Sequence, residues 1–511
     1  MPRCFRRFGL AFVFSLTVVA LDSHYGISQP LNAEDFKKKI PLAGDARVRV
    51  VELRDGKRQV LKGPEEKKNV ADMLTMARVL IYPITDPLIY YPPEPTGKNA
   101  TELKPVAADS TIQYRLDEFD RFITKPGPNS KLSFDQYDYL LEFGKSVDTV
   151  LKELLVDGSP DYIRVNAVRM LAMAAKSGAP AHAKMITDLI TDPNTKPEIL
   201  VYALQAAGAL LSAYDPRLSG GLNAGGHSIK EPELVRLVQA LEKVINRQTP
   251  YGGNKNAKAV ATSGTGIVKE KTETPKVDDK APKTAPKVDP KTTGKLDSAA
   301  TPGDHLDADQ AAVIRFIRRQ AVKALAQSRY PQYSTPTATV RPLFTLARIA
   351  VNDGSFVPDL GPEEYGEAVI GLSNLNSFKG VNIDGVLNCI GIGTSNFARR
   401  KVGNTSDISI PWKIFANRID ATFTDWQKVM ANNGTMTAAA SKVTPLTNLI
   451  TAQVLTPMEK YDKSNPSANA PGLEGLQQWL TPRLTGPLTV YDDLKPDEVA
   501  KYKLKPVLAK N

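Results

Sequence analysis

Residues 317–326 read "IRRQAVKALA", and residues 163–172 read "IRVNAVRMLA". The two stretches are identical at six of their ten positions. Apolar residues recur at every fourth position of the later stretch, at Ile317, Ala321 and Leu325. That spacing predicts a helix with one buried face. The same helix pattern at two distant places in the chain indicates an internal repeat of helical units.

Two weaker copies follow the same pattern, "ILVYALQAAG" at 199–208 and "EYGEAVIGLS" at 364–373. Their small alanines allow close approach of helices, and Ile, Val and Leu fill the core that neighbouring units share. Each unit is expected to stack on the next because it cannot bury its apolar face alone.

The pattern resembles the second helix of a HEAT-type repeat, in which an Asp or Pro precedes a V-R-x-x-A-x-x-x-L-G run. Pro160-Asp161 and Pro197-Glu198 stand where the turn between the two helices of such a unit would fall. The resemblance covers residues 133–248 and 306–375 and implies an all-α solenoid of stacked helical hairpins. One departure is that the first and third copies begin only 36 residues apart, fewer than the roughly 40–47 of this family.

Composition divides the chain into six segments. Residues 251–305, rich in Lys, Thr, Pro and Ala, have no apolar period and predict a disordered linker. The predicted segments are a signal peptide at 1–29, an N-terminal segment at 30–130, a helical repeat block at 131–250, the linker at 251–305, a second helical repeat block at 306–482 and a polar C-terminal tail at 483–511.

The N-terminus resembles an export signal. Three arginines (Arg3, Arg6 and Arg7) precede an apolar run over residues 8–21, which is short for a membrane span. We expect cleavage between Ala20 and Gln29 and a periplasmic or extracellular location, with an uncleaved membrane anchor as the alternative. No later stretch predicts a transmembrane span.

The N-terminal segment predicts a β-hairpin and an extended stretch. Asp55-Gly56 lies between β-prone residues that include Val48, Val50 and Val60, and Asp-Gly favours a hairpin turn. The Pro- and Tyr-rich residues 82–99 exclude a regular helix and predict an extended segment lying on an apolar surface.

No catalytic, cofactor-binding or metal-ligating residue is predicted, and no cofactor. The four histidines (His24, His182, His227 and His305) lack metal-ligand spacing. "GIGTSN" at 391–396 has two of the three glycines of a dinucleotide fingerprint and is interpreted as a helix break or tight turn. The carboxylates of "LDEFDRFI" at 116–123 predict the solvated face of a helix. Cys389, the one cysteine beyond the signal, is expected to be a buried apolar residue.

Two basic clusters and one aromatic stripe are the remaining candidates for binding. The basic clusters (Arg315, Arg318 and Arg319; Arg399, Arg400 and Lys401) lack interleaved aromatic residues, so we expect solvated faces and no nucleic acid. The stripe (Trp412, Phe415, Phe423 and Trp426) predicts core packing, with an exposed binding surface as the alternative.

These features favour an exported, non-enzymatic scaffold or protein-binding protein of the bacterial cell envelope. The net charge of +11 adds an anionic polymer as an alternative partner. The competing hypothesis is an enzyme, or an accessory subunit of one, with a site in the N-terminal or C-terminal segments.

Overall fold

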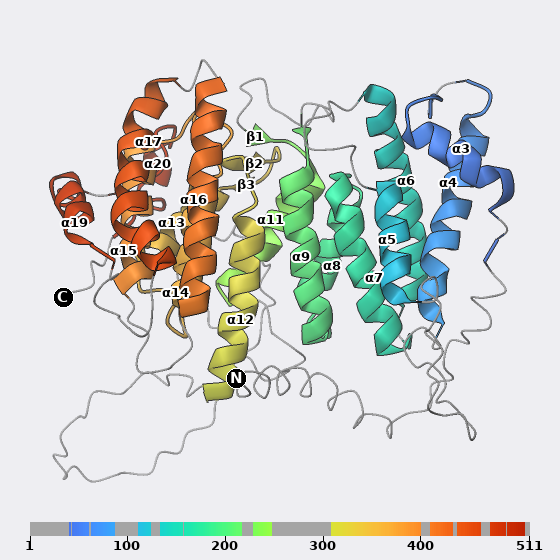
Figure 1. Ribbon diagram of the computed structural model, residues 1–511, viewed down its shortest axis with the longest axis horizontal. Helices are drawn as coiled ribbons and strands as arrows, with labels where there is room; N and C mark the ends of the chain where they lie inside the picture. Colours follow the sequence, from blue (N-terminus) through green and yellow to red (C-terminus); the bar gives the residue numbers. More distant parts are fainter. Residues whose placement is uncertain are drawn as a thin grey trace, which may run out of the picture.

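Helix dominates the structure, a computed structural model, which confirms the expected all-α class. Figure 1 shows the helices side by side in an order that follows the sequence, from α3 and α4 at one end to α17 and α19 at the other. The predicted signal peptide and linker lie outside the described residues. The structure describes residues 40–41, 43–60, 63–86, 111–123, 133–156, 158–216, 228–247, 308–399, 409–432, 437–460, 471–486 and 488–505.

The four copies of the repeated pattern fall on four helices that pack in succession. Helix α7 packs on α9, α9 on α12, and α12 on α14. In α12 the residues Ile317, Ala321 and Leu325 are buried, as the spacing predicts. The bounds are α7 (Asp161–Ala174), α9 (Pro197–Ala213), α12 (Ala308–Leu325) and α14 (Pro362–Leu372).

Each of these helices also packs on the helix that precedes it. The pairs are α6 with α7, α8 with α9, α11 with α12 and α13 with α14. Since α11 and α12 flank the predicted linker, the two predicted helical blocks are in direct contact. The preceding helices are α6 (Phe134–Leu154), α8 (His182–Thr191), α11 (Pro232–Ile245) and α13 (Pro342–Val351).

Small residues bring the successive helices close together. A Cβ atom at Gly208 of α9 would lie 3.2 Å from the Cα of Ala324 in α12. At Gly371 of α14 it would lie 2.8 Å from the Cα of Ala326, directly after α12. Side chains larger than hydrogen would push these helices apart.

The predicted β-hairpin is wrong, because residues 44–54 form helix α3 (Gly44–Arg54). Val50 is buried while Val48 is 61% exposed, so the two valines do not share a strand face. Asp55-Gly56 ends the helix instead. Gly56 has a φ of +72°, and the amide of Lys57 donates to the carbonyl of Glu52 at 2.9 Å, as in a glycine-terminated helix.

Two more helices and one short helical turn complete the described N-terminal part. Helices α4 (Glu66–Ile81) and α5 (Ile112–Ile123) pack against one another, and α4 also packs on α6. The turn η1 (Tyr82–Thr85) replaces the start of the predicted extended segment. Tyr82 is buried and its hydroxyl donates to Glu153 of α6. Residues 87–110 lie outside the described residues.

A small sheet lies between the first and second helical blocks. Strand β1 (Ser228–Ile229) pairs in parallel with β2 (Gln332–Ser334), which pairs antiparallel with β3 (Thr339–Val340). Because β1 precedes α11 and the other strands lie between α12 and α13, the sheet joins segments about 100 residues apart.

The C-terminal part is built around the buried helix α15 (Ile383–Arg399), which packs on α13, α14, α17 and α19. The predicted break at "GIGTSN" is wrong, because these residues lie inside α15. A Cβ at Gly393 would lie 2.9 Å from Val369, so this glycine allows α14 to pack closely on α15. The other elements are α16 (Ser409–Asn432), α17 (Thr437–Ile450), the π-helical η6 (Thr451–Leu455), α18 (Thr456–Glu459), α19 (Glu474–Leu480), η7 (Thr481–Arg483) and α20 (Pro496–Val499); η4 (Ala175–Ser177) extends α7.

Candidate functional site

His182 begins helix α8 and is buried. Its Nδ1 lies 2.6 Å from Oδ1 of Asp148 on α6, so this pair ties two neighbouring helices together. His24, His227 and His305 lie outside the described residues. Within those residues, no group of His, Cys, Asp and Glu side chains could hold a metal ion.

Cys389 is fully buried in α15, which confirms its expected role as a small apolar residue. Burial raises the pKa of its thiol well above the ordinary value. A thiol that stays protonated is a poor nucleophile.

The first basic cluster is only in part the solvated face that the sequence predicts: Arg315 is exposed and Arg319 is partly exposed, but Arg318 is not. Arg318 is fully buried and forms an ion pair with Glu364 of α14. Its two Nη atoms also donate to the carbonyls of Pro358 and Asp359, at 2.8 and 3.2 Å. Since carboxylate and carbonyl oxygens surround the guanidinium, it is not available to an external anion.

Two other acidic residues of α14, Glu363 in the first turn and Glu367 in the second, bind two further arginines. Arg319 donates to Glu363 at 3.1 Å, and Arg418 of α16 makes two bonds of 2.8 Å to the buried Glu367. These bonds hold α14 between α12 and α16. In the second basic cluster, Arg399 ends α15, and the side chains of all three residues lie outside the description.

The aromatic stripe of α16 is buried, which confirms the core interpretation. Phe415 and Phe397 have ring centroids 5.8 Å apart, and Trp426 and Phe378 have centroids 5.7 Å apart. On α5, Asp117 is exposed and Asp120 pairs with Lys176 at 3.3 Å, as expected for a solvated face.

A polar cluster outside the predicted candidates involves the C-terminal strap, our name for residues 488–505. This stretch falls within the predicted polar tail, yet it packs on the start of α13. Arg341, 7% exposed, lies 4.6 Å from the ring centroid of Tyr491 and 5.2 Å from that of Tyr502. It also pairs with Asp493 at 3.2 Å and Glu498 at 3.6 Å.

Glu242 of α11 lies at the edge of this cluster and is partly buried. Burial raises the pKa of its carboxyl group to about 7. The hydroxyl of Thr345, which donates to Oε1 at 2.8 Å, and the charges of Arg348 and Lys501 act in the opposite direction. Glu242 therefore titrates near neutral pH, where few carboxyl groups do.

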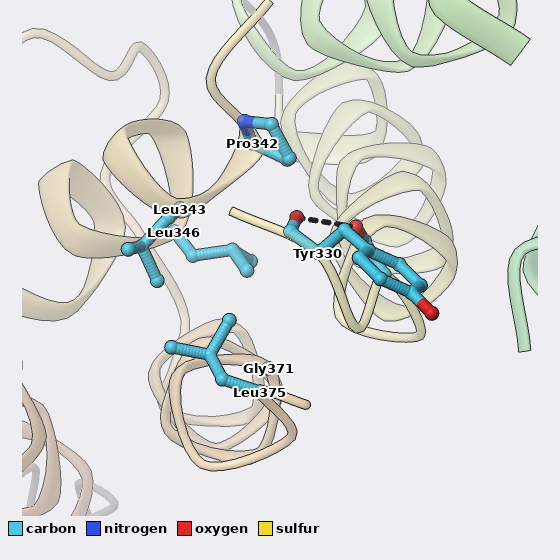
Figure 2. Close-up of a pocket in the computed structure, with 7 residues that line it drawn as sticks. Tyr330, Pro342, Leu343, Leu346, Gly371 and Leu375 are labelled. Carbon is cyan, nitrogen blue, oxygen red and sulfur yellow. Dashed lines mark hydrogen bonds between the residues drawn. The ribbon is translucent and has the colours of Figure 1, made fainter. Parts of the chain in front are cut away.

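A shallow apolar hollow lies beside Pro342, at the start of α13 (Figure 2). Leu343, Leu346 and Leu375 surround it, and the hydroxyl of Tyr330 turns away from these leucines. The hollow leaves no room for a water molecule, so it is a packing defect rather than a ligand pocket. Its remaining lining residues are Ser328, Pro342 and Gly371.

Sequence reasoning missed both Glu242 and Arg341. Glu242 follows Val235 and Val238 and precedes Ile245 at helical spacing, which places it beside the buried stripe of α11. A carboxylate at such a position is the signal that could have identified it. Arg341 gives no comparable signal, because its ion-pair partners lie 152 or more residues later in the chain.

The chain matches no family model, no curated protein and no solved structure. In the part of the chain that the structure describes, no helix has the length and apolarity needed to cross a membrane.

Proposed function

We propose that the protein is an exported, non-enzymatic scaffold or protein-binding protein of the bacterial cell envelope, built as a HEAT-like α-solenoid. The carrying observation is that α7, α9, α12 and α14 pack in succession, each also against its preceding helix. Stacked units of this kind provide an extended surface on which a protein partner can lie. The net charge of +11 makes an anionic polymer the alternative partner.

The partners of the buried carboxylates support a structural role for these residues rather than a catalytic one. Four buried carboxylates each have an arginine or histidine partner that joins two helices: Asp72 with Arg49, Asp148 with His182, Glu364 with Arg318 and Glu367 with Arg418. The partly buried Glu242 bonds to the hydroxyl of Thr345 instead. A catalytic acid or base must instead reach a substrate. The competing proposal, an enzyme or accessory subunit, would place its site in the N-terminal or C-terminal segments.

Export is tested by fractionation of the native host and N-terminal sequencing of the protein. We expect a mature N-terminus between residues 21 and 30 in the periplasmic or extracellular fraction. An intact N-terminus in the membrane fraction would support the retained anchor, and an intact N-terminus in the cytoplasm would contradict export.

Binding is tested with the full chain carrying an affinity tag within residues 251–305, which lie outside the described residues. We expect a cross-linked envelope protein that stays bound in about 1 M salt, where charges are screened within about 3 Å. A partner released by that salt would identify an anionic polymer. Complete absence of a retained partner at physiological salt would count against the scaffold proposal.

A further inference from the structure

Helices α7 and α9 repeat the arrangement of α12 and α14. Arg164 of α7 stands at the repeat position of Arg318 in α12, and each follows a buried isoleucine. Helix α9 begins with Pro-Glu-Ile at residues 197–199, and α14 begins with Pro-Glu-Glu at 362–364. Because α7 packs on α9 as α12 packs on α14, the surroundings of the two arginines can be compared position by position.

The acceptors that surround Arg318 are missing around Arg164. Arg318 donates to Glu364 and to two carbonyls of the loop before α14. Glu364 also accepts from the amide of Gly361 at the start of α14, whereas α9 has no side-chain cap. At the position of Glu364, α9 carries Ile199, whose side chain cannot accept a hydrogen bond.

The guanidinium of Arg164 is left without a partner. Among the described residues, its side chain has no hydrogen bond and no ion pair. Its Nε is buried, although the side chain as a whole is partly exposed. Arginine is always charged, and a buried donor without an acceptor costs free energy. An acceptor that approached from solvent would therefore stabilise this side chain.

Two buried hydroxyls at the same ends of α7 and α9 also lack partners within the described residues. Ser159, two residues before α7, is 7% exposed, and Thr195, two residues before α9, is 3% exposed. Lys196 joins these two ends, because its Nζ lies 2.5 Å from Oδ2 of Asp161. That ion pair also occupies Asp161, the acidic residue one turn before Arg164.

We propose that Arg164 binds the carboxylate of an external ligand between the N-terminal ends of α7 and α9. The ligand carboxylate takes the place that Glu364 fills between α12 and α14. A guanidinium and a carboxylate match in shape and share two parallel hydrogen bonds. The hydroxyl of Thr195 is a further donor, and the partial positive charge at the start of α9 adds to the attraction. The site is independent of the proposed scaffold role.

NMR spectroscopy of the full chain, labelled with ¹⁵N at arginine, tests the site with acetate as the probe. The Nε–H signal of Arg164 is identified by its absence from Arg164→Met. At constant ionic strength, we expect acetate to shift this signal with a dissociation constant of about 1–10 mM, the range that two or three charged hydrogen bonds provide. An Arg164 signal that does not move at about 100 mM acetate would overturn the proposal.

Arg169→Met is the matched control, on the same helix and with the same loss of charge. Arg169 already donates to Asn166 at 2.9 Å, and its Cζ lies 5.8 Å from the ring centroid of Tyr202. In this variant the Arg164 signal should respond to acetate as in the unmodified chain. A lost response would show that the effect depends on general charge and would contradict a site at Arg164.

A second variant fills the site from within the chain. Ile199→Glu installs the residue that α14 carries at this position, so its carboxylate should pair with Arg164 while the chain stays folded. The Arg164 signal should then be shifted without acetate, and added acetate should have no further effect. A variant that unfolds on circular dichroism, or one that still binds acetate, would contradict the equivalence of the two arginine positions.

Two further probes identify the source of the carboxylate. A blocked pentapeptide with one central glutamate that binds about 10-fold or more tightly than acetate would assign the site to an acidic side chain of a partner protein. Equal affinity of the peptide and acetate would assign it to a small organic acid. Inorganic phosphate that binds more tightly than acetate would overturn the carboxylate assignment.

Discussion

Replacing Glu364 by Gln should destabilise the protein far more than the same change at the adjacent Glu363. Both residues lie in the first turn of α14, and both pair with an arginine of α12. The surroundings differ: Arg318 and Glu364 have side chains 0% and 2% exposed, whereas those of Arg319 and Glu363 are each 31% exposed.

The expected magnitude follows from that difference. Glu364→Gln leaves the Arg318 guanidinium buried without a counter-charge, and the new amide NH₂ competes with its donors for the same space. Removing one partner of a buried ion pair costs about 3–5 kcal/mol. Glu363→Gln removes a partly exposed pair, for which solvent screening leaves about 0–1 kcal/mol.

Urea unfolding, followed by fluorescence of the buried Trp412 and Trp426, gives the free energy of unfolding of each variant. A double variant, Arg318→Met with Glu364→Met, should cost less than Glu364→Gln alone, because apolar side chains of similar volume can replace a buried pair at little cost. Equal losses for Glu364→Gln and Glu363→Gln would refute the reasoning. The reasoning would also be refuted if the double variant lost as much free energy of unfolding as the sum of the losses in Arg318→Met and Glu364→Met measured separately.

Three further outcomes are expected. Replacing residues 251–305 by about 12 Gly and Ser residues should keep the helical content and stabilise the protein by about 1 kcal/mol, through the shorter closed loop; loss of folding on circular dichroism would contradict direct packing of α11 on α12. Gly393→Ala should cost about 1–3 kcal/mol in urea unfolding, because its Cβ would lie 2.9 Å from Val369; a neutral effect would mean that α14 and α15 can separate freely. Cys389 should resist thiol reagents at about pH 8 until urea unfolds the chain, because burial raises its pKa; rapid labelling of the native protein would show that α15 opens.

The helices with a regular apolar period were predictable from the sequence, and the ends of several were not. The Val48 and Val50 pair fits both a strand and a helix. The structure resolves the ambiguity through Ala46, Val50 and Leu53, which are buried at helical spacing. Asp55-Gly56 suits a hairpin turn and a helix end equally well, because each needs a residue of positive φ.

Glycines inside α15 misled the sequence interpretation for a related reason. A glycine in a helix weakens it by about 1 kcal/mol relative to alanine, so two glycines close together suggest a break. Here Gly391 and Gly393 face Leu480 and Val369, so close packing on two sides offsets the lost helix propensity. That offset depends on residues of other helices, which the local sequence around the glycines does not indicate.

The contrast between Arg318 and Arg319 sets the limit of what one sequence can predict. The two are adjacent, and the helical period turns each residue by about 100° relative to the last. The period therefore predicts that the two side chains point in different directions. It does not predict which of them is buried against α14. That depends on where Glu364, 46 residues later, is placed by its own helix. The same holds for Arg341 and Asp493, which are 152 residues apart. A buried ion pair thus depends on how distant helices pack, whereas the sequence pattern of one helix indicates only which of its own faces is apolar.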